Sequence, residues 1–289
     1  MRNKELFDLL DTDVKKQIAD PELIQHANNF ILDDYRDLET HDIQTFFSKK
    51  ILENPSNKIS GYEKFIHHEF VIGVTQFIDN LVMKHGINGL QILKHDYRYY
   101  QRLNPDLKFA EINRLEPYKP LVMSMPFAGH CDVHKDMNKI LEECQQKNID
   151  VHLDCAWLTC AEGINFNFDH PCIKSFASSL SKAYNLGWNR IGVRWTKEVD
   201  PTDPITIYNK FHMYNESLCK IGYHMAKHFP INFLWEKYRN FYYQGCRETY
   251  TFPTKIIWLT KDPYGELYGT SKLLTHLYNV SMNDNHLFG

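Results

Sequence analysis

The sequence predicts an α/β protein with a mostly parallel sheet of seven strands, flanked by helices, and a smaller, mainly helical C-terminal domain. Short apolar runs recur between residues 69 and 196, and helical stretches separate several of them. Strands that alternate with helices are typical of a parallel sheet, because parallel neighbours need a long crossover connection. The expected strands are Glu69–Gly73, Leu90–His95, Lys108–Ile112, Pro120–Met125, Ile149–Asp154, Cys172–Ser178 and Arg190–Thr196.

Two of the segments between these strands have the spacing of helices with one apolar face. Gln76–His85 is the first. The second is Lys135–Lys147, whose apolar face is formed by Met137, Ile140, Leu141 and Cys144. Ligands of such folds bind beyond the carboxyl ends of the strands, so the residues that follow each strand are the candidates for function.

Three domains are expected along the chain. Residues 1–60 are predicted to form an N-terminal helical arm or part of a small domain, residues 61–197 the large sheet domain, and residues 198–289 the small C-terminal domain. The turn-rich segment Asp200–Pro204 marks the second boundary. In the C-terminal domain the pattern predicts one strand, Lys255–Thr260, and the helices Ile205–His228, Phe233–Tyr243 and Ser271–Tyr278.

Composition and charge narrow the possible classes of function. The chain has 289 residues, 43% of them apolar, and its net charge of −3 gives no electrostatic footprint for nucleic acid. It has no apolar run long enough for a bilayer, and a signal peptide is not expected at its charged start, so no membrane partner is expected. Seven scattered cysteines favour reduced thiols and a cytoplasmic location. The 15 histidines show no metal-binding motif, and no metal is expected.

The segment from residue 178 to residue 192 contains the largest group of candidate functional side chains. Lys182 follows Ser179 and Ser181 at the end of an apolar strand, and Arg190 stands eight residues further on. A lysine in a partly buried, cationic setting loses its proton more easily and becomes a nucleophile, while hydroxyls and a guanidinium bind phosphate. The alternative is a surface lysine with serines that cap a helix, which the added arginine disfavours.

This segment resembles the cofactor-lysine signature of class I/II aminotransferases, in which S-x-S-K is followed by R-x-G, here ending at Gly192. The resemblance implies fold type I and pyridoxal 5'-phosphate (PLP) as cofactor. It implies that Lys182 forms the Schiff base with PLP and that Ser179 and Arg190 bind the phosphate. Ser181 is a further residue that we expect to bind the cofactor.

Two further motifs of the family have counterparts upstream. Asp154-Cys155-Ala156-Trp157 resembles D-x-A-Y, which implies that Asp154 pairs with the pyridine nitrogen and that Trp157 lies at the ring oxygen. Gly73-Val74-Thr75 resembles the glycine-led turn whose amides hold the phosphate, which implicates Val74 and Thr75. A carboxylate after a strand can also cap a loop, and many helices begin like this turn.

The remaining cofactor contacts are expected from an aromatic residue and from a histidine. The family stacks an aromatic side chain on the pyridine ring, and Tyr97 is the candidate, with Tyr99 and Tyr100 as alternatives. A surface cluster of tyrosines is an equal possibility. Where the family has an asparagine in N-P-x-G, this chain has Met125–His130, and His130 is the candidate for that role.

The resemblance implies a homodimeric aminotransferase that moves an amino group from a small-molecule donor to a 2-oxo acid or other carbonyl acceptor. Lys182 and Asp154 are its expected catalytic residues. The arginine that binds a substrate carboxylate is not found, since Arg239 and Arg247 lie outside the expected context. A PLP-dependent lyase or decarboxylase, and a catalytically inactive scaffold of the same fold, are the alternatives.

Overall fold

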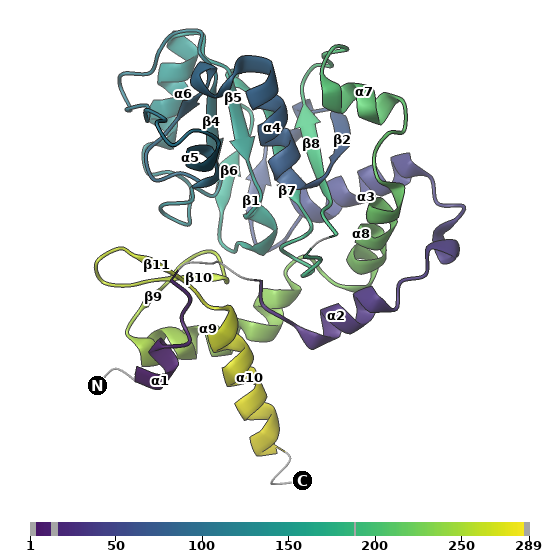
Figure 1. The fold of residues 1–289 in the computed structure, drawn as a ribbon, viewed down its shortest axis with the longest axis vertical. Coiled ribbons are helices and arrows are strands. Elements are labelled where there is room, and N and C mark those ends of the chain that lie inside the picture. Colours follow the sequence, from purple (N-terminus) through teal and green to yellow (C-terminus); the bar gives the residue numbers. More distant parts are fainter. Residues whose placement is uncertain (1–3, 13–16, 188, 286–289) are drawn as a thin grey trace.

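The computed structural model describes residues 4–12, 17–187 and 189–285, without the side chains of residues 283–285. Its main feature is a mixed sheet with strand order β2-β8-β7-β5-β4-β3 (Figure 1). The strands of this sheet are β2 (His67–Val71), β3 (Gln91–Ile92), β4 (Leu121–Ser124), β5 (Val151–Asp154), β7 (Ile173–Ser179) and β8 (Gly192–Thr196). Strands β3, β4, β5 and β7 are parallel, whereas β8 is antiparallel to both of its neighbours. The α/β class is thereby confirmed.

The sheet has six strands within the described residues, not the seven that were predicted. The predicted strand Lys108–Ile112 contributes a single isolated bridge, from Ala110 to Leu93. It forms no ladder because the neighbouring strand β3 is short. His95 has a φ of 69°, which turns the backbone away from the extended conformation just beyond that bridge.

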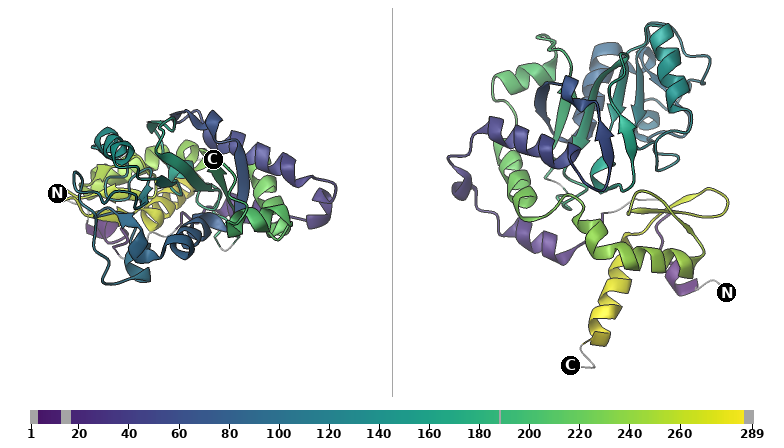
Figure 2. Two further views of the ribbon diagram at one scale, coloured as in Figure 1. Left: turned by 90° about the horizontal axis from the view of Figure 1, so that it is seen from above. Right: turned by 180° about the vertical axis from the view of Figure 1, so that it is seen from behind.

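Helices cover both faces of the sheet, as the alternation of apolar residues along its strands requires. Val122 and Ala177 pack in the hydrophobic cluster of α4 (Gly73–His85). Their chain neighbours Met123 and Phe176 point the other way, into the larger cluster beneath α3 and α6. Figure 1 shows α4 in front of the sheet, and the rear view in Figure 2 shows α3 on the opposite face. Helix α3 spans Thr40–Leu52 and α6 spans Met137–Gln146.

The N-terminal residues contain short helices that lie against the C-terminal part of the chain. Helix α2 contacts α8, and α1 contacts α9. These elements are α1 (Lys4–Phe7), α2 (Pro21–Asn28) and the 3₁₀ helix η1 (Leu32–Tyr35). Strand β1 (Lys58–Ser60) pairs in parallel with β6 (Asn165–Asn167), a segment between β5 and β7 in the sequence, and the two form a separate small sheet. Short helices complete this half of the chain: η2 (Tyr62–Lys64), η3 (Ile87–Gly89), α5 (Tyr99–Leu103) and η4 (Leu158–Cys160).

The C-terminal residues differ from the prediction in one helix. The predicted helix Ile205–His228 is two helices, α7 (Pro204–Lys210) and α8 (Glu216–His228). Between them His212 has a φ of 54°, and the Asn215 side chain caps the new helix by accepting from the Leu218 amide. Helix α9 (Phe233–Thr249), a three-stranded sheet and α10 (Ser271–Asn285) follow. The strands are β9 (Phe252–Pro253), β10 (Leu259–Lys261) and β11 (Leu267–Gly269).

A buried ion network fixes α7 to the sheet. Arg194 of β8 donates from Nε to Glu69 of β2 at 2.8 Å and from Nη1 to Asp203 at 2.9 Å. Asp203 is also the cap of α7. All three side chains are buried, so each charge depends on the others for compensation. In the described part of the chain, no helix is long and apolar enough to cross a membrane.

Candidate functional site

The candidate residues lie at the carboxyl ends of the three central parallel strands. Ser124 is the last residue of β4, Asp154 of β5 and Ser179 of β7. The register pairs Ser124 with Asp154, and Asp154 with Ala177, so these strand ends are adjacent. This is the edge at which α/β sheets bind their ligands, as the sequence had indicated.

Lys182 and Asp154 are brought close enough to influence each other's charge. Burial lowers the pKa of Lys182, the negative charge of Asp154 opposes that effect, and Arg190 adds to it. Burial raises the pKa of Asp154, while a hydrogen bond from the Ala156 amide and the charge of Lys182 lower it. Among the described residues, Lys182 and Asp154 form no ion pair within 4.0 Å.

Trp157 covers the amine of Lys182. The Nζ atom lies 4.7 Å from the centroid of the Trp157 ring, the geometry of a cation–π contact. The indole in turn meets Trp258 edge-on at 5.6 Å between ring centroids. Trp157 therefore links the lysine to the C-terminal residues of the chain and holds the amine in a partly apolar setting.

The turn at the start of α4 meets Arg190. Gly73 has a φ of 64°, and the Arg190 guanidinium packs so closely on it that a Cβ there would lie 2.9 Å from Nη2. The same Nη2 donates to Thr75 Oγ1 at 2.8 Å. The first amides of a helix, an exposed guanidinium and a hydroxyl thus converge in one place, which suits a phosphate.

Ser179 and Ser181 are both bonded to the backbone of Ile191. Ser179 Oγ donates to the Ile191 carbonyl at 2.9 Å, and Ser181 Oγ accepts from the Ile191 amide at 3.4 Å. Both serines are buried. In this arrangement they position the loop between β7 and β8, which carries Lys182 and Arg190. Their contact with a phosphate stays a prediction.

Tyr97 is the candidate tyrosine that the charges of both Asp154 and Arg190 affect, whereas Asp154 also affects Tyr100 and Arg190 also affects Tyr99. Burial and the charge of Asp154 raise the pKa of Tyr97, and Arg190 lowers it. Its side chain is 38% exposed. Tyr99 donates to Asp79 at 2.5 Å, and burial together with this bond raises the pKa of Tyr99 to about 12. Tyr100 is fully buried in the cluster under α4.

His130 lies among other neighbours. It is exposed, and its ring packs 5.3 Å from Phe127 and 5.2 Å from His134. Partial burial of the ring lowers the pKa of His130, and the charge of Lys261 adds to that shift. Among the described residues no contact joins His130 to Asp154 or Lys182. Its role as a cofactor residue stays a prediction.

The structure adds Asp96 and Ser124 to the candidate residues. The Ser124 hydroxyl donates to Asp96 Oδ1, and the Ser124 amide donates to Oδ2 at 3.0 Å. Burial raises the pKa of Asp96 to about 6 despite these bonds, and the charge of Asp154 adds to the rise. Asp96 therefore places a second ionisable carboxyl group beside Asp154. The sequence offered one signal, since Asp96 directly precedes Tyr97 after a strand.

The two C-terminal arginines are not equivalent. Arg239 donates to Glu162 Oε1 at 2.5 Å and lies 5.7 Å from the Trp235 ring centroid. Arg247 is exposed. Arg239 already has a carboxylate partner, which is the kind of group that a substrate would bring.

The chemistry of these side chains fits PLP as a bound cofactor. The buried Asp154 carboxylate has one hydrogen-bond donor among the described residues, the Ala156 amide at 2.9 Å, so it lacks the compensation that a protonated ring nitrogen would give. The Lys182 amine has no hydrogen-bond partner among the described residues, and its pKa is lowered. An anion cradle lies at Gly73, Thr75 and Arg190.

Comparisons with known proteins support this fold. No protein-family profile matches the sequence, and no curated protein matches it. Among solved structures, the PLP-bound C-S lyase from Staphylococcus hominis has a TM-score of 0.62 and 11% identity over 89% of this chain and 76% of that chain. Tyrosine aminotransferase from Leishmania infantum has a TM-score of 0.63 and 10% identity over 95% of both chains. An aminotransferase from Mycobacterium tuberculosis has a TM-score of 0.61 and 13% identity, over 84% of this chain and 73% of that chain.

These likenesses establish that the chain has the fold of the PLP-dependent aminotransferases and C-S lyases. One fold supports several reactions, so the function of this chain has to be argued from its own side chains.

Proposed function

We propose that the chain is a PLP-dependent enzyme that transfers an amino group from an amino donor to a 2-oxo acid or other carbonyl acceptor. One observation carries the proposal: a partly buried lysine with a lowered pKa lies within electrostatic range of a buried aspartate at the carboxyl edge of the sheet. Groups with perturbed pKa values at such an edge are typical of catalytic sites.

Each candidate residue has a role that follows from its position. Asp154 would keep the ring nitrogen protonated, which makes the bound ring an acceptor for electrons released at the substrate. The Val74 and Thr75 amides and Arg190 would hold the phosphate, with Ser179 and Ser181 supporting the loop. Tyr97 would stack on the ring, and Trp157 and His130 would lie at its oxygen.

Lys182 would have two functions. PLP supplies a carbonyl that condenses with amines, and the Lys182 amine is the group that would bind it covalently as a Schiff base. Once a substrate amine has replaced it, the freed Nζ would move a proton from the substrate α-carbon to the neighbouring cofactor carbon. The lowered pKa favours the neutral amine that both functions need.

A PLP-dependent lyase is the second candidate function. Structural neighbours include C-S lyases, and an L-threonine-O-3-phosphate decarboxylase also matches, with a TM-score of 0.50. Trp157 occupies the position of the family tyrosine, and an indole N–H donates a hydrogen bond but cannot accept one. Product analysis with and without a 2-oxo acid distinguishes the two, because only transamination requires the acceptor.

The experiment is an absorption spectrum of the purified chain with added PLP. The wild type should show a Schiff-base band that borohydride removes. Lys182→Ala should lack the band, and Lys174→Ala, which changes an exposed lysine on β7, should keep it. If the band were equally strong in Lys182→Ala, the assignment of the lysine would be wrong. No band in any variant would support the inactive scaffold.

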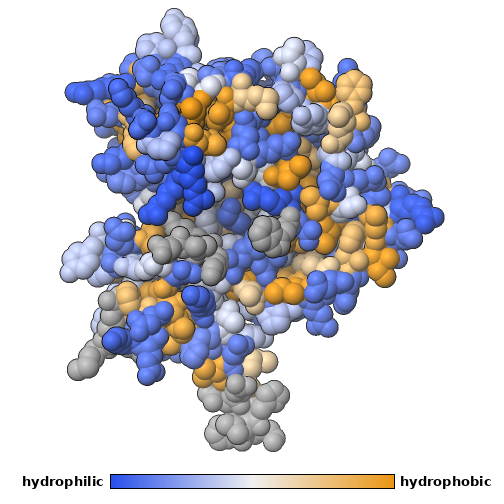
Figure 3. All heavy atoms as spheres, viewed as in Figure 1, coloured by the Kyte–Doolittle hydropathy of each residue, from blue (hydrophilic) through white to orange (hydrophobic). Residues whose placement is uncertain are grey.

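We further propose that the chain acts as a homodimer. Figure 3 shows apolar side chains gathered on the side of the molecule where α7 and α8 lie. Exposed apolar residues there include Phe211 and Met213, at 63% and 65% exposure, and such patches often mark interfaces. A mass of one chain in light scattering at micromolar concentration would contradict this proposal.

A further inference from the structure

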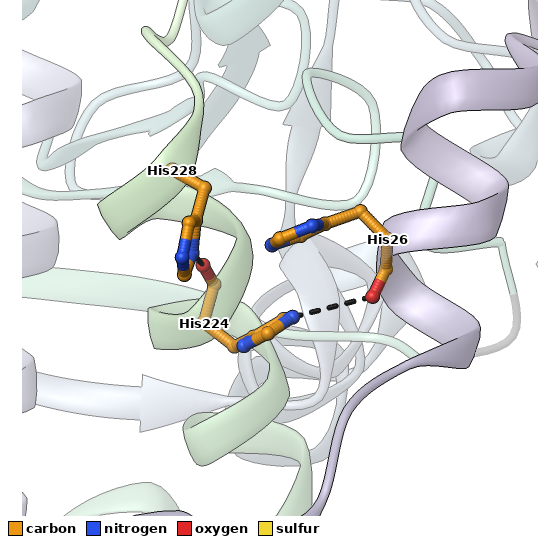
Figure 4. Close-up of side chains that lie close together, drawn as sticks. All are labelled: His26, His224 and His228. Carbon is orange, nitrogen blue, oxygen red and sulfur yellow. Dashed lines mark hydrogen bonds between the residues drawn. The ribbon is translucent and has the colours of Figure 1, made fainter.

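Three histidines that are far apart in the sequence meet between α2 and α8. His26 comes from α2, and His224 and His228 come from α8. One nitrogen of each ring lies within 4.8 Å of the others. The rings of His26 and His224 are stacked at 4.2 Å, and the ring of His228 lies beside them, 4.3 Å from that of His26 (Figure 4).

The hydrogen bond of His228 fixes its tautomer. Its Nδ1 lies 2.8 Å from the carbonyl oxygen of His224, one turn earlier on the helix. A carbonyl can only accept, so Nδ1 carries the proton and Nε2 presents a lone pair. Metal-binding histidines commonly have this pattern, with one ring nitrogen bonded to a backbone carbonyl and the other free for the ion.

His26 supplies an unsatisfied atom. Its Nε2 is buried and has no hydrogen-bond partner among the described residues. A buried polar atom without a partner is unfavourable and calls for an explanation, such as an ion that the atom would bind.

His224 can present its own Nε2 after a change of tautomer. At present Nε2 lies 3.2 Å from the His26 carbonyl oxygen, and Nδ1 lies 2.6 Å from the hydroxyl of Tyr35. If the proton moves to Nδ1, that nitrogen donates to the Tyr35 oxygen, and Nε2 becomes free to bind an ion. Tyr35 is therefore a positioning residue that would hold the ring in either form.

Aromatic side chains pack against His26 and His224. The rings of Phe229 and Phe30 pack edge-on against the same two histidines, at 5.1 and 5.6 Å between centroids. These ring contacts hold the imidazoles of His26 and His224 in place, while His228 is exposed.

We propose that His26, His224 and His228 bind one divalent transition-metal ion of the Zn²⁺ class through their Nε2 atoms, with water as the fourth ligand. Imidazole nitrogen is a preferred ligand of Zn²⁺, Ni²⁺ and Cu²⁺, whereas Mg²⁺ and Ca²⁺ prefer oxygen. Tetrahedral zinc with bonds of about 2.0–2.1 Å places its nitrogens about 3.4 Å apart. To complete the site, the rings of His26 and His224 would rotate out of their stacked arrangement. The ion would fasten α2 to α8.

The test uses the full chain without an affinity tag, freed of metal with a chelator and titrated with Co²⁺, whose visible bands report tetrahedral nitrogen ligation. Zn²⁺ then displaces the Co²⁺. We expect one ion per chain. His228→Gln should weaken Co²⁺ binding at least about 100-fold, and Tyr35→Phe about 10-fold, the effect of losing a group that orients a ligand. His41→Gln, which changes an exposed histidine outside the cluster, should leave binding unchanged.

A thermal measurement provides the second readout. Zn²⁺ should raise the melting temperature of the wild type and of His41→Gln, but not that of His228→Gln, because an ion that binds only the folded chain stabilises it. His228 is exposed, so its replacement should leave the metal-free fold intact. The inference is overturned if the wild type shows no saturable Co²⁺ binding, or if His228→Gln binds Co²⁺ as tightly as the wild type.

Discussion

Gly73→Ala should weaken PLP binding in addition to destabilising the fold. Gly73 has a φ of 64°, and its missing side chain is what lets the Arg190 guanidinium lie against the turn. An added methyl group would lie 2.9 Å from Nη2 and 3.0 Å from Nε of Arg190. Since those atoms are the far end of a flexible side chain, the guanidinium can move away and leave Thr75.

The two effects can be estimated separately. A left-handed conformation costs an alanine about 1–2 kcal/mol, which lowers the free energy of unfolding by that amount. Displacing Arg190 removes a charge-assisted hydrogen bond to the phosphate, a contribution of about 1.5–3 kcal/mol. Because about 1.4 kcal/mol corresponds to a tenfold change, the dissociation constant of PLP should rise about 10- to 100-fold.

Gly163→Ala is the matched control. Gly163 has a φ of 75°, and a Cβ there would approach nothing closer than Lys255 Cε at 4.0 Å. Both variants should lose similar stability in urea unfolding, and only Gly73→Ala should lose PLP affinity in an absorbance titration. If the two variants bind PLP equally well, Arg190 and the turn at Gly73 do not form the phosphate site.

Three further predictions concern buried ionisable groups. Asp154→Asn should raise the PLP dissociation constant about 10- to 100-fold in the same titration, because the ring nitrogen loses its counter-charge; unchanged affinity would contradict the pairing. Glu69→Gln leaves Arg194 partly uncompensated and should cost about 3–5 kcal/mol in urea unfolding, whereas the exposed Glu116→Gln should cost less than about 0.5 kcal/mol; equal costs would refute a role for burial. Burial lowers the pKa of His152 to about 3. The unfolded chain therefore takes up this proton first, and stability should fall as pH drops from about 6.5 toward 3. In His152→Gln, the midpoint of urea unfolding should depend less on pH in this range. An unchanged pH dependence would refute the role of His152.

The large sheet could be predicted because its signal is local. A buried strand needs a run of apolar residues, and a covering helix needs one apolar face, so both are visible in short windows of sequence. The strands near residues 121, 151, 173 and 192 and the helix near 137 appear close to where they were expected. The exceptions have local backbone causes that hydrophobicity does not reveal: the positive φ at His95 and at His212.

The candidate site was partly predictable for a related reason. Lys182, Asp154 and the turn at Gly73 lie at the ends of apolar segments, and parallel strands bring such ends to one edge of the sheet. The partners of each group were not predictable. Nothing in the sequence indicated that Ser179 would bond to Ile191, and the position of Asp96 after a strand did not show that its carboxyl would lie buried beside Asp154.

The sequence by itself determined the α/β class, the order of most elements and the residue types present at the carboxyl edge of the sheet. Tertiary structure decided which side chains meet across long separations. His26 and His224 are joined only because α2 packs on α8, and Trp157 reaches Trp258 only after the C-terminal residues fold back. Periodicity reports which face of an element is buried, but not which other element covers it, since any apolar surface of matching shape can do so.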